Sequence, residues 1–485
     1  MKKILKCCCS LVLAFTVIFG VTACKKKLSN TTVDLTNVKQ VNGVSTNGGV
    51  TAVYGEYLYF INGTKTNDGT SVKNNKRSAV YRVKYNVETG AVDESTYELV
   101  VDDMVGFDNG SLYFFGDFMY YATPSADVNY KGDVLYYKTK FMRYDLVNKK
   151  SYTLYTTKQN SESESISYAY YIVGDSLNLV VYEADNYSVT SLKIGKETTT
   201  NYVIDDVTSC VMSENFGKCV TENKTVDANS YVYYTLSHDS YEAIQTGVKV
   251  YRTSPVSNNS VLLSDDGKDV ALLCVRNGKL LYSVNDIIYA HEITGTESEK
   301  ISFDFGDIIS YQTYENVIFM ENADGSISLL SYNKDTYQLV VCKWENGVDI
   351  QNHTINVLSK AENFEFVTLA TIDEVVVEDK EDTDEDETKT EKVQFLIYIH
   401  DGAIYKIEIA RENSSGDMVL SKYTEPVKLS TTTVQASSGL IVPEVIGNYL
   451  FVYAQDDSKN VYMFKADISI KETSTKKATF VGVKE

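Results

Sequence analysis

Apolar and polar positions alternate between Thr51 and Asn86 with the period of a β-strand. The stretch reads Thr51-Ala-Val-Tyr-Gly-Glu-Tyr-Leu-Tyr-Phe60, passes through a polar loop and resumes as Val80-Tyr-Arg-Val-Lys-Tyr-Asn86. A period of two residues is typical of strands with one buried face, so the stretch predicts a hairpin. Because one hairpin cannot bury its apolar face alone, we expect stacked copies that share a core.

The same pattern returns down to the C-terminus and can be read as eight copies. Their recognisable segments are residues 51–102, 109–145, 170–194, 229–252, 272–291, 316–332, 366–405 and 445–482. Eight copies of about four short strands each predict an all-β fold, a β-propeller of about eight (alternatively seven) four-stranded blades. A β-solenoid and a pair of β-sandwiches are the alternatives. The copies are unevenly spaced and show no sharp blade signature, and the single tryptophan, Trp344, excludes an array of Trp-Asp blades.

The first 23 residues have the pattern of a signal peptide. Lys2, Lys3 and Lys6 form a positive segment, and an apolar run from Leu11 to Val21 follows it. The run is too short for a permanent membrane-spanning helix, so cleavage is expected.

The end of this segment, Val21-Thr-Ala-Cys24, resembles the lipobox of bacterial lipoproteins. The resemblance implies cleavage before Cys24, lipidation of Cys24 and a firm anchor in the membrane, since two acyl chains hold a protein where one does not. The alternative is an ordinary secretory signal. Residues 24–49 are polar and predict a tether, which leaves residues 50–485 for the repeat domain.

Charge limits the partners of the mature chain. After removal of residues 1–23, 43 Lys and Arg stand against 66 Asp and Glu, a net charge of −23. Nucleic-acid binding depends on neutralising phosphates with basic side chains, so a nucleic-acid partner is not expected.

Four cysteines follow the anchor. Cys210 and Cys219 lie nine residues apart and are the candidate pair for a disulfide across a hairpin, while Cys274 and Cys342 lie in apolar strand-like runs that favour buried thiols. No Cys-x-x-Cys motif is present, so neither a zinc site nor a redox site is predicted.

An acidic run between Glu378 and Glu391 is the most conspicuous local feature. Asp382, Asp384 and Asp386 alternate as in a calcium-binding loop, but the glycine and the final glutamate of an EF-hand are missing. The run is therefore interpreted as a solvated, flexible hairpin insertion between Val377 and Val393.

Catalytic patterns are not evident in the sequence. The histidines are scattered among the copies, and there is no nucleophile elbow, P-loop or dinucleotide fingerprint. We predict no catalytic residue, no metal site and no cofactor. The histidines are His238, His291, His353 and His400.

Two segment pairs carry a further resemblance. Tyr57-Leu-Tyr-Phe60 with Val80-Tyr-Arg-Val83, and Tyr231-Val-Tyr-Tyr234 with Val250-Tyr-Arg252, resemble propeller-like domains of lipoproteins and surface proteins from low-GC Gram-positive bacteria. The resemblance implies a fold and a location, without an activity.

Together these features predict a lipoprotein on the extracytoplasmic face of the cell membrane. Its propeller is expected to act as a non-catalytic binding or scaffold domain for a protein or an envelope glycan. The alternative is an extracytoplasmic glycan hydrolase with carboxylate catalysis in the propeller.

Overall fold

The computed structural model describes the chain between Gly49 and Gly482, with gaps at many connections. The predicted signal peptide, Cys24 and the tether up to residue 48 lie outside the described residues. Among the residues described, no helix is long and apolar enough to cross a membrane. The segments left undescribed are residues 1–48, 66–77, 106–111, 129–133, 158–165, 174–175, 184–187, 195–197, 206, 213–219, 222–231, 237–249, 255–256, 265–269, 277–278, 285–286, 293–300, 304–313, 322–326, 334–337, 345–353, 361–364, 379–386, 417, 422–423, 434–441, 456–459 and 483–485.

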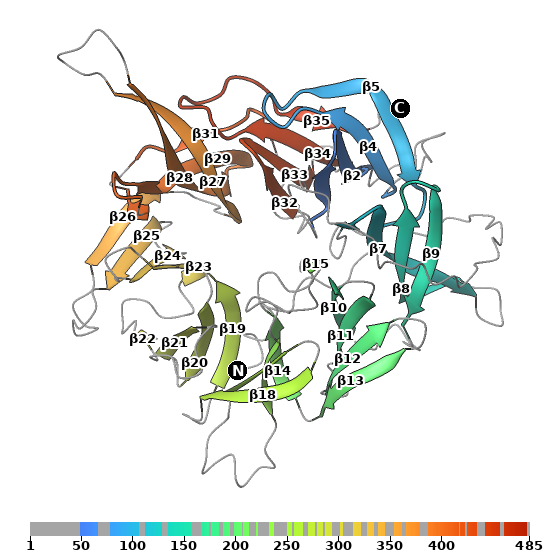
Figure 1. Ribbon diagram of the computed structural model, residues 1–485. Helices are drawn as coiled ribbons and strands as arrows, with labels where there is room; N and C mark the ends of the chain where they lie inside the picture. Colours follow the sequence, from blue (N-terminus) through green and yellow to red (C-terminus); the bar gives the residue numbers. More distant parts are fainter. Residues whose placement is uncertain are drawn as a thin grey trace. The chain divides into compact units, whose positions relative to one another are not determined.

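All regular elements of the described chain are β-strands, and they form eight sheets (Figure 1). The first sheet consists of β1 (Thr51–Tyr54), β2 (Tyr57–Ile61), β4 (Val80–Tyr85) and β5 (Val92–Val101). The second consists of β6 (Tyr113–Phe115), β7 (Phe118–Val128), β8 (Val134–Asp145) and β9 (Lys150–Thr156). The third has β10 (Ile166–Val173), β11 (Ser176–Glu183), β12 (Ser188–Ile194) and β13 (Thr199–Ile204), with β15 (Val220–Thr221) beside β10. The fourth has β14 (Val207–Met212), β16 (Val232–Leu236), β17 (Val250–Ser254) and β18 (Ser257–Ser264).

The other four sheets repeat this plan. The fifth has β19 (Val270–Arg276), β20 (Lys279–Val284), β21 (Ile287–Glu292) and β22 (Ile301–Phe303). The sixth has β23 (Tyr314–Glu321), β24 (Ile327–Asn333), β25 (Gln338–Trp344) and β26 (Thr354–Lys360). The seventh has β27 (Glu365–Glu378), β28 (Glu387–His400), β29 (Ala403–Glu412) and β30 (Met418–Leu420), with β31 (Val427–Lys428) also on β29. The eighth has β32 (Val442–Ile446), β33 (Tyr449–Gln455) and β34 (Asn460–Asp467), flanked by β3 (Thr64–Lys65) and β35 (Thr479–Val481).

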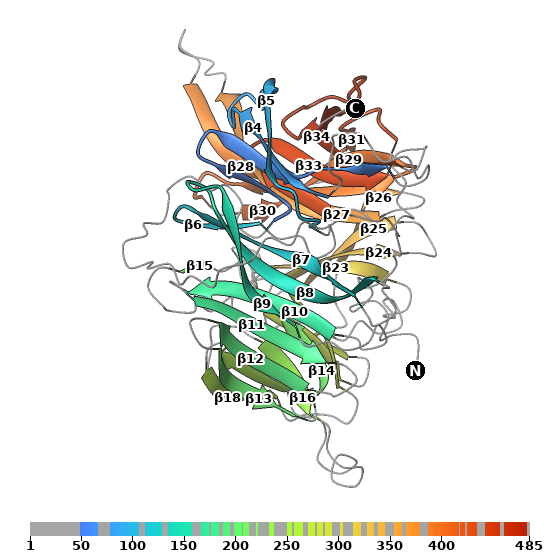
Figure 2. The same ribbon diagram turned by 90° about the vertical axis from the view of Figure 1, so that its right-hand side faces the viewer.

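Each predicted copy corresponds to one sheet. Within a sheet, strands that follow one another in the chain pair antiparallel, as β10 to β13 do side by side in Figure 2. A four-stranded antiparallel meander is the blade unit of a β-propeller, which confirms the all-β, propeller-type fold class. A β-solenoid is excluded for the described strands because their repeat is antiparallel. The number of blades stays a prediction.

The chain divides into two compact units. The described residues within 49–54 and 99–303 form one, and those within 55–98 and 304–482 form the other.

In the first unit, neighbouring sheets pack face to face through apolar side chains. Phe118, Phe141 and Tyr170 belong to the cluster between the second and third sheets, with Tyr170 edge-on to Phe141 at 5.3 Å between ring centroids. Such aromatic pairs add to the free energy gained by burying their area. A second cluster, which includes Val189 and Val232, joins the third and fourth sheets.

In the second unit, the seventh and eighth sheets share a core that includes Phe395, Ile397 and Val452. Strands from the two ends of the chain also meet in this unit. Strand β3 pairs with β34, and the Tyr453 hydroxyl donates a hydrogen bond to the carbonyl of Ile61. The polar loop that follows Phe60 therefore supplies strand β3 to the eighth sheet, a pairing that the sequence did not predict.

A blade signature, not predicted from the sequence, recurs at the turn between the first two strands of three sheets. Gly55, Gly116 and Gly447 have φ values of 63°, 56° and 57°, and each is followed by Glu, Asp or Asn and then by a tyrosine or phenylalanine. Positive φ at the first central residue of a two-residue turn strongly favours glycine.

The third strand of each of these sheets completes the signature. A cation lies over the aromatic ring that begins the second strand: Arg82 over Tyr57 at 4.4 Å, Arg143 over Phe118 at 5.0 Å and Lys465 over Tyr449 at 4.7 Å. A backbone hydrogen bond also joins the end of the third strand to the turn. The carbonyl of the residue that follows the glycine accepts it from the last residue of the third strand or the residue just after that strand. Tyr85 donates to Glu56, Leu146 to Asp117 and Ile468 to Asn448. The signature is found in three of the eight sheets of the described chain and varies in residue type at each position.

Candidate binding arm and its charged base

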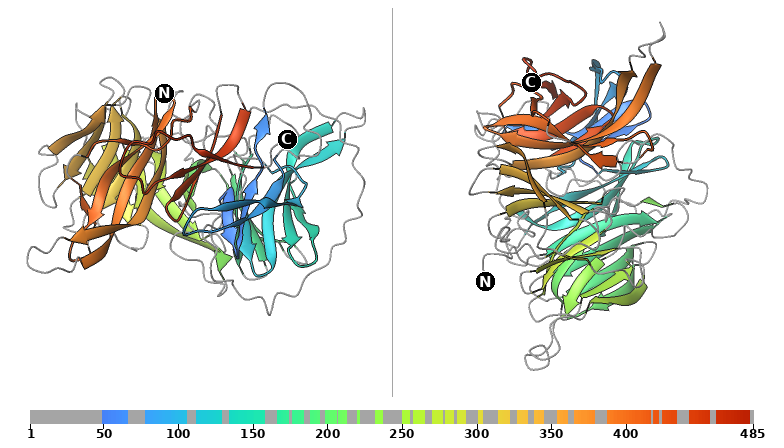
Figure 3. Two further views of the ribbon diagram at one scale, coloured as in Figure 1. Left: turned by 90° about the horizontal axis from the view of Figure 1, so that it is seen from above. Right: turned by 90° about the vertical axis from the view of Figure 1, so that its left-hand side faces the viewer.

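The longest hairpin of the described chain is formed by β27 and β28. Each strand has 14 residues, whereas β29 pairs with β28 only between Val393 and His400. Among the described strands, the parts that extend beyond β29, Asp373–Glu378 and Glu387–Lys392, pair only with each other. We call these two segments the arm; Figures 1 and 3 show it as the end of the long orange hairpin.

The arm corrects the interpretation of the acidic run. A hairpin is present, as predicted, but its strands continue to Glu378 and resume at Glu387, so residues 387–392 are not a flexible loop. Cross-strand pairing of Val375 with Thr390 and Val376 with Lys389 accounts for this, because β-branched residues favour strands. Asp382, Asp384 and Asp386, whose alternation is like that of a calcium-binding loop, lie outside the described residues.

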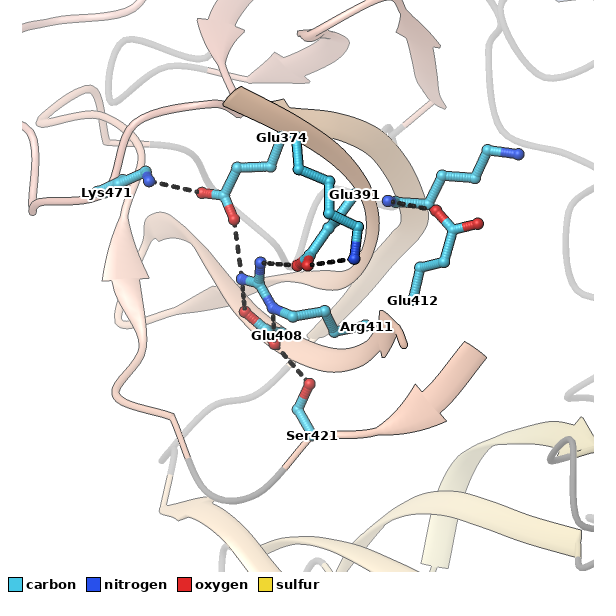
Figure 4. Close-up of polar contacts among 9 residues, drawn as sticks. Glu374, Glu391, Glu408, Arg411, Glu412, Ser421 and Lys471 are labelled. Carbon is cyan, nitrogen blue, oxygen red and sulfur yellow. Dashed lines mark hydrogen bonds and ion pairs between the residues drawn. The ribbon is translucent and has the colours of Figure 1, made fainter. Parts of the chain in front are cut away.

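Arg411 organises the base of the arm (Figure 4). Its guanidinium makes a two-pronged contact with Glu408 from the same strand, at 3.1 Å for Nε and 2.8 Å for Nη2. Nη2 also contacts Glu374 of β27 at 2.8 Å, and Nη1 contacts Glu391 of β28 at 3.3 Å. One side chain thus ties three adjacent strands together through ion pairs.

Further polar groups surround this centre. The Lys471 Nζ lies 3.3 Å from Glu374, the Lys389 Nζ lies 3.3 Å from Glu391, and the Ser421 hydroxyl donates to Glu408 at 2.5 Å. The exposed fraction of each of the three carboxylate side chains is only 14–15%. We call the set of Glu374, Glu391, Glu408, Arg411 and Lys471 the base cluster.

Glu374 and Arg411 keep their charges near neutral pH. Burial acts to raise the pKa of Glu374, but hydrogen bonds from Arg411 and Lys471 outweigh it and hold that pKa below its ordinary value. Hydrogen bonding to Glu408 outweighs burial at Arg411 and raises its pKa. These carboxylates are bound by cations, an arrangement suited to bracing strands. In the described chain no group of three or more acidic, histidine or cysteine side chains is arranged to hold a metal ion.

Strand β29 also carries a buried lysine. The Lys406 side chain is 4% exposed, its Nζ donates to the carbonyl of Ile468 at 2.6 Å, and it lies 4.0 Å from the centre of the Phe395 ring. Burial lowers the pKa of Lys406 to about 8. Its contacts are with the core between the seventh and eighth sheets.

The other face of the arm is open. Asp373, Thr390 and Lys392 are exposed there, and Val375 is 58% exposed. Along the side of β28 that β29 no longer covers, the backbone N–H of Lys392 donates to the Glu412 carboxylate at 2.9 Å. The arm therefore combines a braced base with an exposed strand face.

Of the residues singled out from the sequence, those that the structure describes do not belong to the base cluster. Cys24, Cys219, His238 and His353 lie outside the described residues, and Cys210 lies in β14, so the Cys210–Cys219 disulfide stays a prediction. His400 ends β28 with its Nε2 3.5 Å from Asp401, and His291 lies in β21.

Sequence reasoning missed the base cluster for a physical reason. Its members are spread from residue 374 to residue 471 among many other charges, and only the pairing of Glu374 with Glu391 brings both beside Arg411. The one available signal was the β-branched residues near the acidic run, the three valines 375–377 before it and Thr388 and Thr390 at its end.

Comparisons with known proteins identify no family for this chain. No protein-family model matches the chain, and no curated protein matches it. A prolyl endopeptidase structure is similar over 75% of this chain with 10% identity and a TM-score of 0.42; this chain spans 48% of that protein. An initiation factor from a eukaryote is similar over 92% of this chain and 89% of its own length, with 10% identity and a TM-score of 0.40. The WD40 domain of SCAP from fission yeast is similar over 90% of this chain and 96% of its own length, with 8% identity and a TM-score of 0.36. TM-scores below 0.5 carry no inference about activity, and the fold assignment depends on the sheet topology.

Proposed function

We propose that this protein is a lipid-anchored binding or scaffold protein on the extracytoplasmic face of a bacterial membrane, where it holds a protein or an envelope glycan. The observation that carries the proposal is the braced arm. Three carboxylates from three strands converge on Arg411, so the arm has a fixed direction where its strands leave the sheet.

An arm that is already ordered before a partner arrives is better suited to binding that partner than to packing within the protein. Rigid scaffolds commonly present their binding residues on segments that extend from the core. A segment that is already ordered loses less conformational entropy when a partner binds, which favours affinity. The exposed Val375 and Thr390 lie on this ordered segment.

The partner test compares the mature chain with a version that lacks the arm. Glu374 and Glu391 lie directly opposite each other, so an Asn-Gly turn can replace residues 375–390 and leave the base cluster intact. We expect the full chain to retain an envelope component that the shortened chain does not retain, while both show the same thermal unfolding. Identical sets of retained components would contradict the proposal.

The anchor is tested separately in growing cells. Cys24→Ala should abolish incorporation of a labelled fatty acid and release the protein from the membrane fraction, because the thioether to diacylglycerol needs the Cys24 thiol. Cys7→Ala, in the predicted signal peptide, is the matched control and should leave both readouts unchanged. Equal labelling of the Cys24→Ala protein would show that the chain is not a lipoprotein.

A further inference from the structure

We propose that the outer edge of β28 in the arm binds an extended, lysine- or arginine-bearing segment of a partner protein as an added β-strand. This inference rests on the proposed binding function and specifies its partner and its mode.

The direction of the backbone groups at this edge follows from one hydrogen bond. The N–H of Lys392 points away from β27, because it donates to Glu412 on the β29 side at 2.9 Å. Backbone groups alternate in direction along a strand, so the N–H and C=O of Thr390 and Thr388 point to the same side. No strand of the described chain pairs with this side of residues 387–392.

An open, regular edge of this kind is a template for another strand. Two successive edge residues supply two donors and two acceptors, the pattern used when peptides add to a sheet. The exposed side chain of Thr390 is the direct cross-strand neighbour that such a peptide would contact. The Glu412 carboxylate occupies the Lys392 donor, so the added strand is expected to pair from Thr390 toward the end of the arm.

The charge of the arm indicates which kind of segment binds at the outer edge of β28. Apart from Glu374 and Glu391, which are paired in the base cluster, the described arm residues contain three acidic and two basic side chains, and the eight residues between the arm's strands add six acids and one lysine in the sequence. A second copy of this chain would bring the same excess of negative charge to the edge, which disfavours arm-to-arm pairing. A basic segment is favoured by the same field, chiefly at low ionic strength.

The test uses the mature full-length chain with Cys24→Ser and a fluorescent synthetic peptide of alternating lysine and valine. Thr390→Pro removes the outward N–H and places a ring in the path of the added strand, yet leaves the bonds to β27, because that N–H does not face β27. Thr390→Val is the matched control, since it keeps the backbone and the branched shape. Anisotropy should show binding that Thr390→Pro weakens at least about tenfold and Thr390→Val changes less than about twofold.

A second measurement does not depend on how well the proline variant folds. Two peptides are compared, one N-methylated at its odd-numbered residues and the other at its even-numbered residues. Their affinities for the unmodified chain should differ at least about tenfold, because only one of the two methylation phases removes the N–H groups that pair with β28. Peptide binding should also slow amide hydrogen exchange at residues 387–392.

Several results would overturn strand addition by a basic segment. These are equal binding by the Thr390→Pro and Thr390→Val chains, equal affinity for both methylation phases, or equal affinity for a peptide with glutamate in place of lysine. A concentration-dependent dimer that Thr390→Pro abolishes would identify a second copy as the occupant instead. If removing the arm eliminates envelope binding while Thr390→Pro does not, the proposed binding function stands and strand addition fails.

Discussion

Arg411 illustrates how much of this protein's local structure depends on single charged side chains. Its guanidinium contacts Glu374, Glu391 and Glu408, which lie on three strands. Three carboxylates this close repel one another, and the cation between them converts that repulsion into attraction. With the side chain of Arg411 34% exposed, solvent screens part of the interaction.

Arg411→Met is therefore expected to lower the free energy of unfolding by roughly 1–3 kcal/mol, since it leaves partly buried carboxylates without their cation. Urea unfolding measures the change. Lys84→Met is the control, because the Lys84–Glu56 pair is exposed at 45% and 62%, and it should change the free energy of unfolding by about 0.5 kcal/mol or less. Equal effects of the two variants would show that the cluster does not brace the arm.

Lys406 makes stability depend on pH in the alkaline range. Its pKa is about 8 in the folded protein against an ordinary value of 10.5. Between pH 8 and 10.5 the unfolded chain binds more protons than the folded chain, so the free energy of unfolding rises with pH. This gain in stability is lost as the pH falls through 8. The stability difference between the wild type and Lys406→Met should therefore shift in favour of the wild type from pH 8 toward pH 10. A difference that stays constant over this range would refute the assignment.

At the scale of elements, the turns and the third strands act together. In the blade signature a glycine of positive φ sets the turn, and a cation from the third strand covers the ring that follows it. Gly90, in the turn between β4 and β5, also has a positive φ of 66°, and its carbonyl accepts a hydrogen bond from Lys465 of the same signature. A side chain at Gly90 would meet the Tyr449 ring, with Cζ only 2.3 Å from the added Cβ.

Gly90→Ala and Gly55→Ala separate backbone strain from crowding. Both positions have positive φ, but no atom lies within 4 Å of a Cβ at Gly55. Gly55→Ala should cost about 1 kcal/mol of stability from the backbone alone. Gly90→Ala should cost roughly 2–3 kcal/mol, because the Tyr449 ring must also leave its place beside Lys465. Urea unfolding of both variants measures these costs, and equal costs would mean that the ring moves freely.

At the scale of the whole molecule, tyrosine is a core residue. Tyr59, Tyr121, Tyr398 and Tyr453 are among the largest fully buried side chains of the described chain. Aromatic side chains bury a large area and pack well across neighbouring strands. The abundance of tyrosine in the sequence therefore reflects the packing of sheets in the described parts.

Buried tyrosines predict alkaline unfolding. Burial raises the pKa of Tyr85, Tyr121, Tyr170 and Tyr202 above the ordinary value of 10. Stability from these neutral phenols is complete below pH 10 and is lost as pH rises above it, because only the unfolded chain then releases their protons. Phenolate absorbance should rise cooperatively with the loss of the circular dichroism of the sheets. Ionisation of all the tyrosines while the sheets persist would contradict the burial of these hydroxyls.

The sequence by itself determined the class of the fold and the position of each repeat. Alternation of apolar and polar residues is local, so each of the eight copies could be recognised from neighbouring residues and each became one sheet. The hairpin at the acidic run was recognisable on the same grounds, from the valines that precede it.

Only the tertiary structure decided which distant residues meet. Strand β3 is two residues long and lies in a polar loop, and its pairing with β34 depends on how the two ends of the chain come together in one unit. The base cluster likewise needs the register that sets Glu374 opposite Glu391 and places both beside Arg411. Register and long-range pairing depend on the packing of whole sheets, and for that reason the local pattern that predicted the blades could not predict the arm's brace.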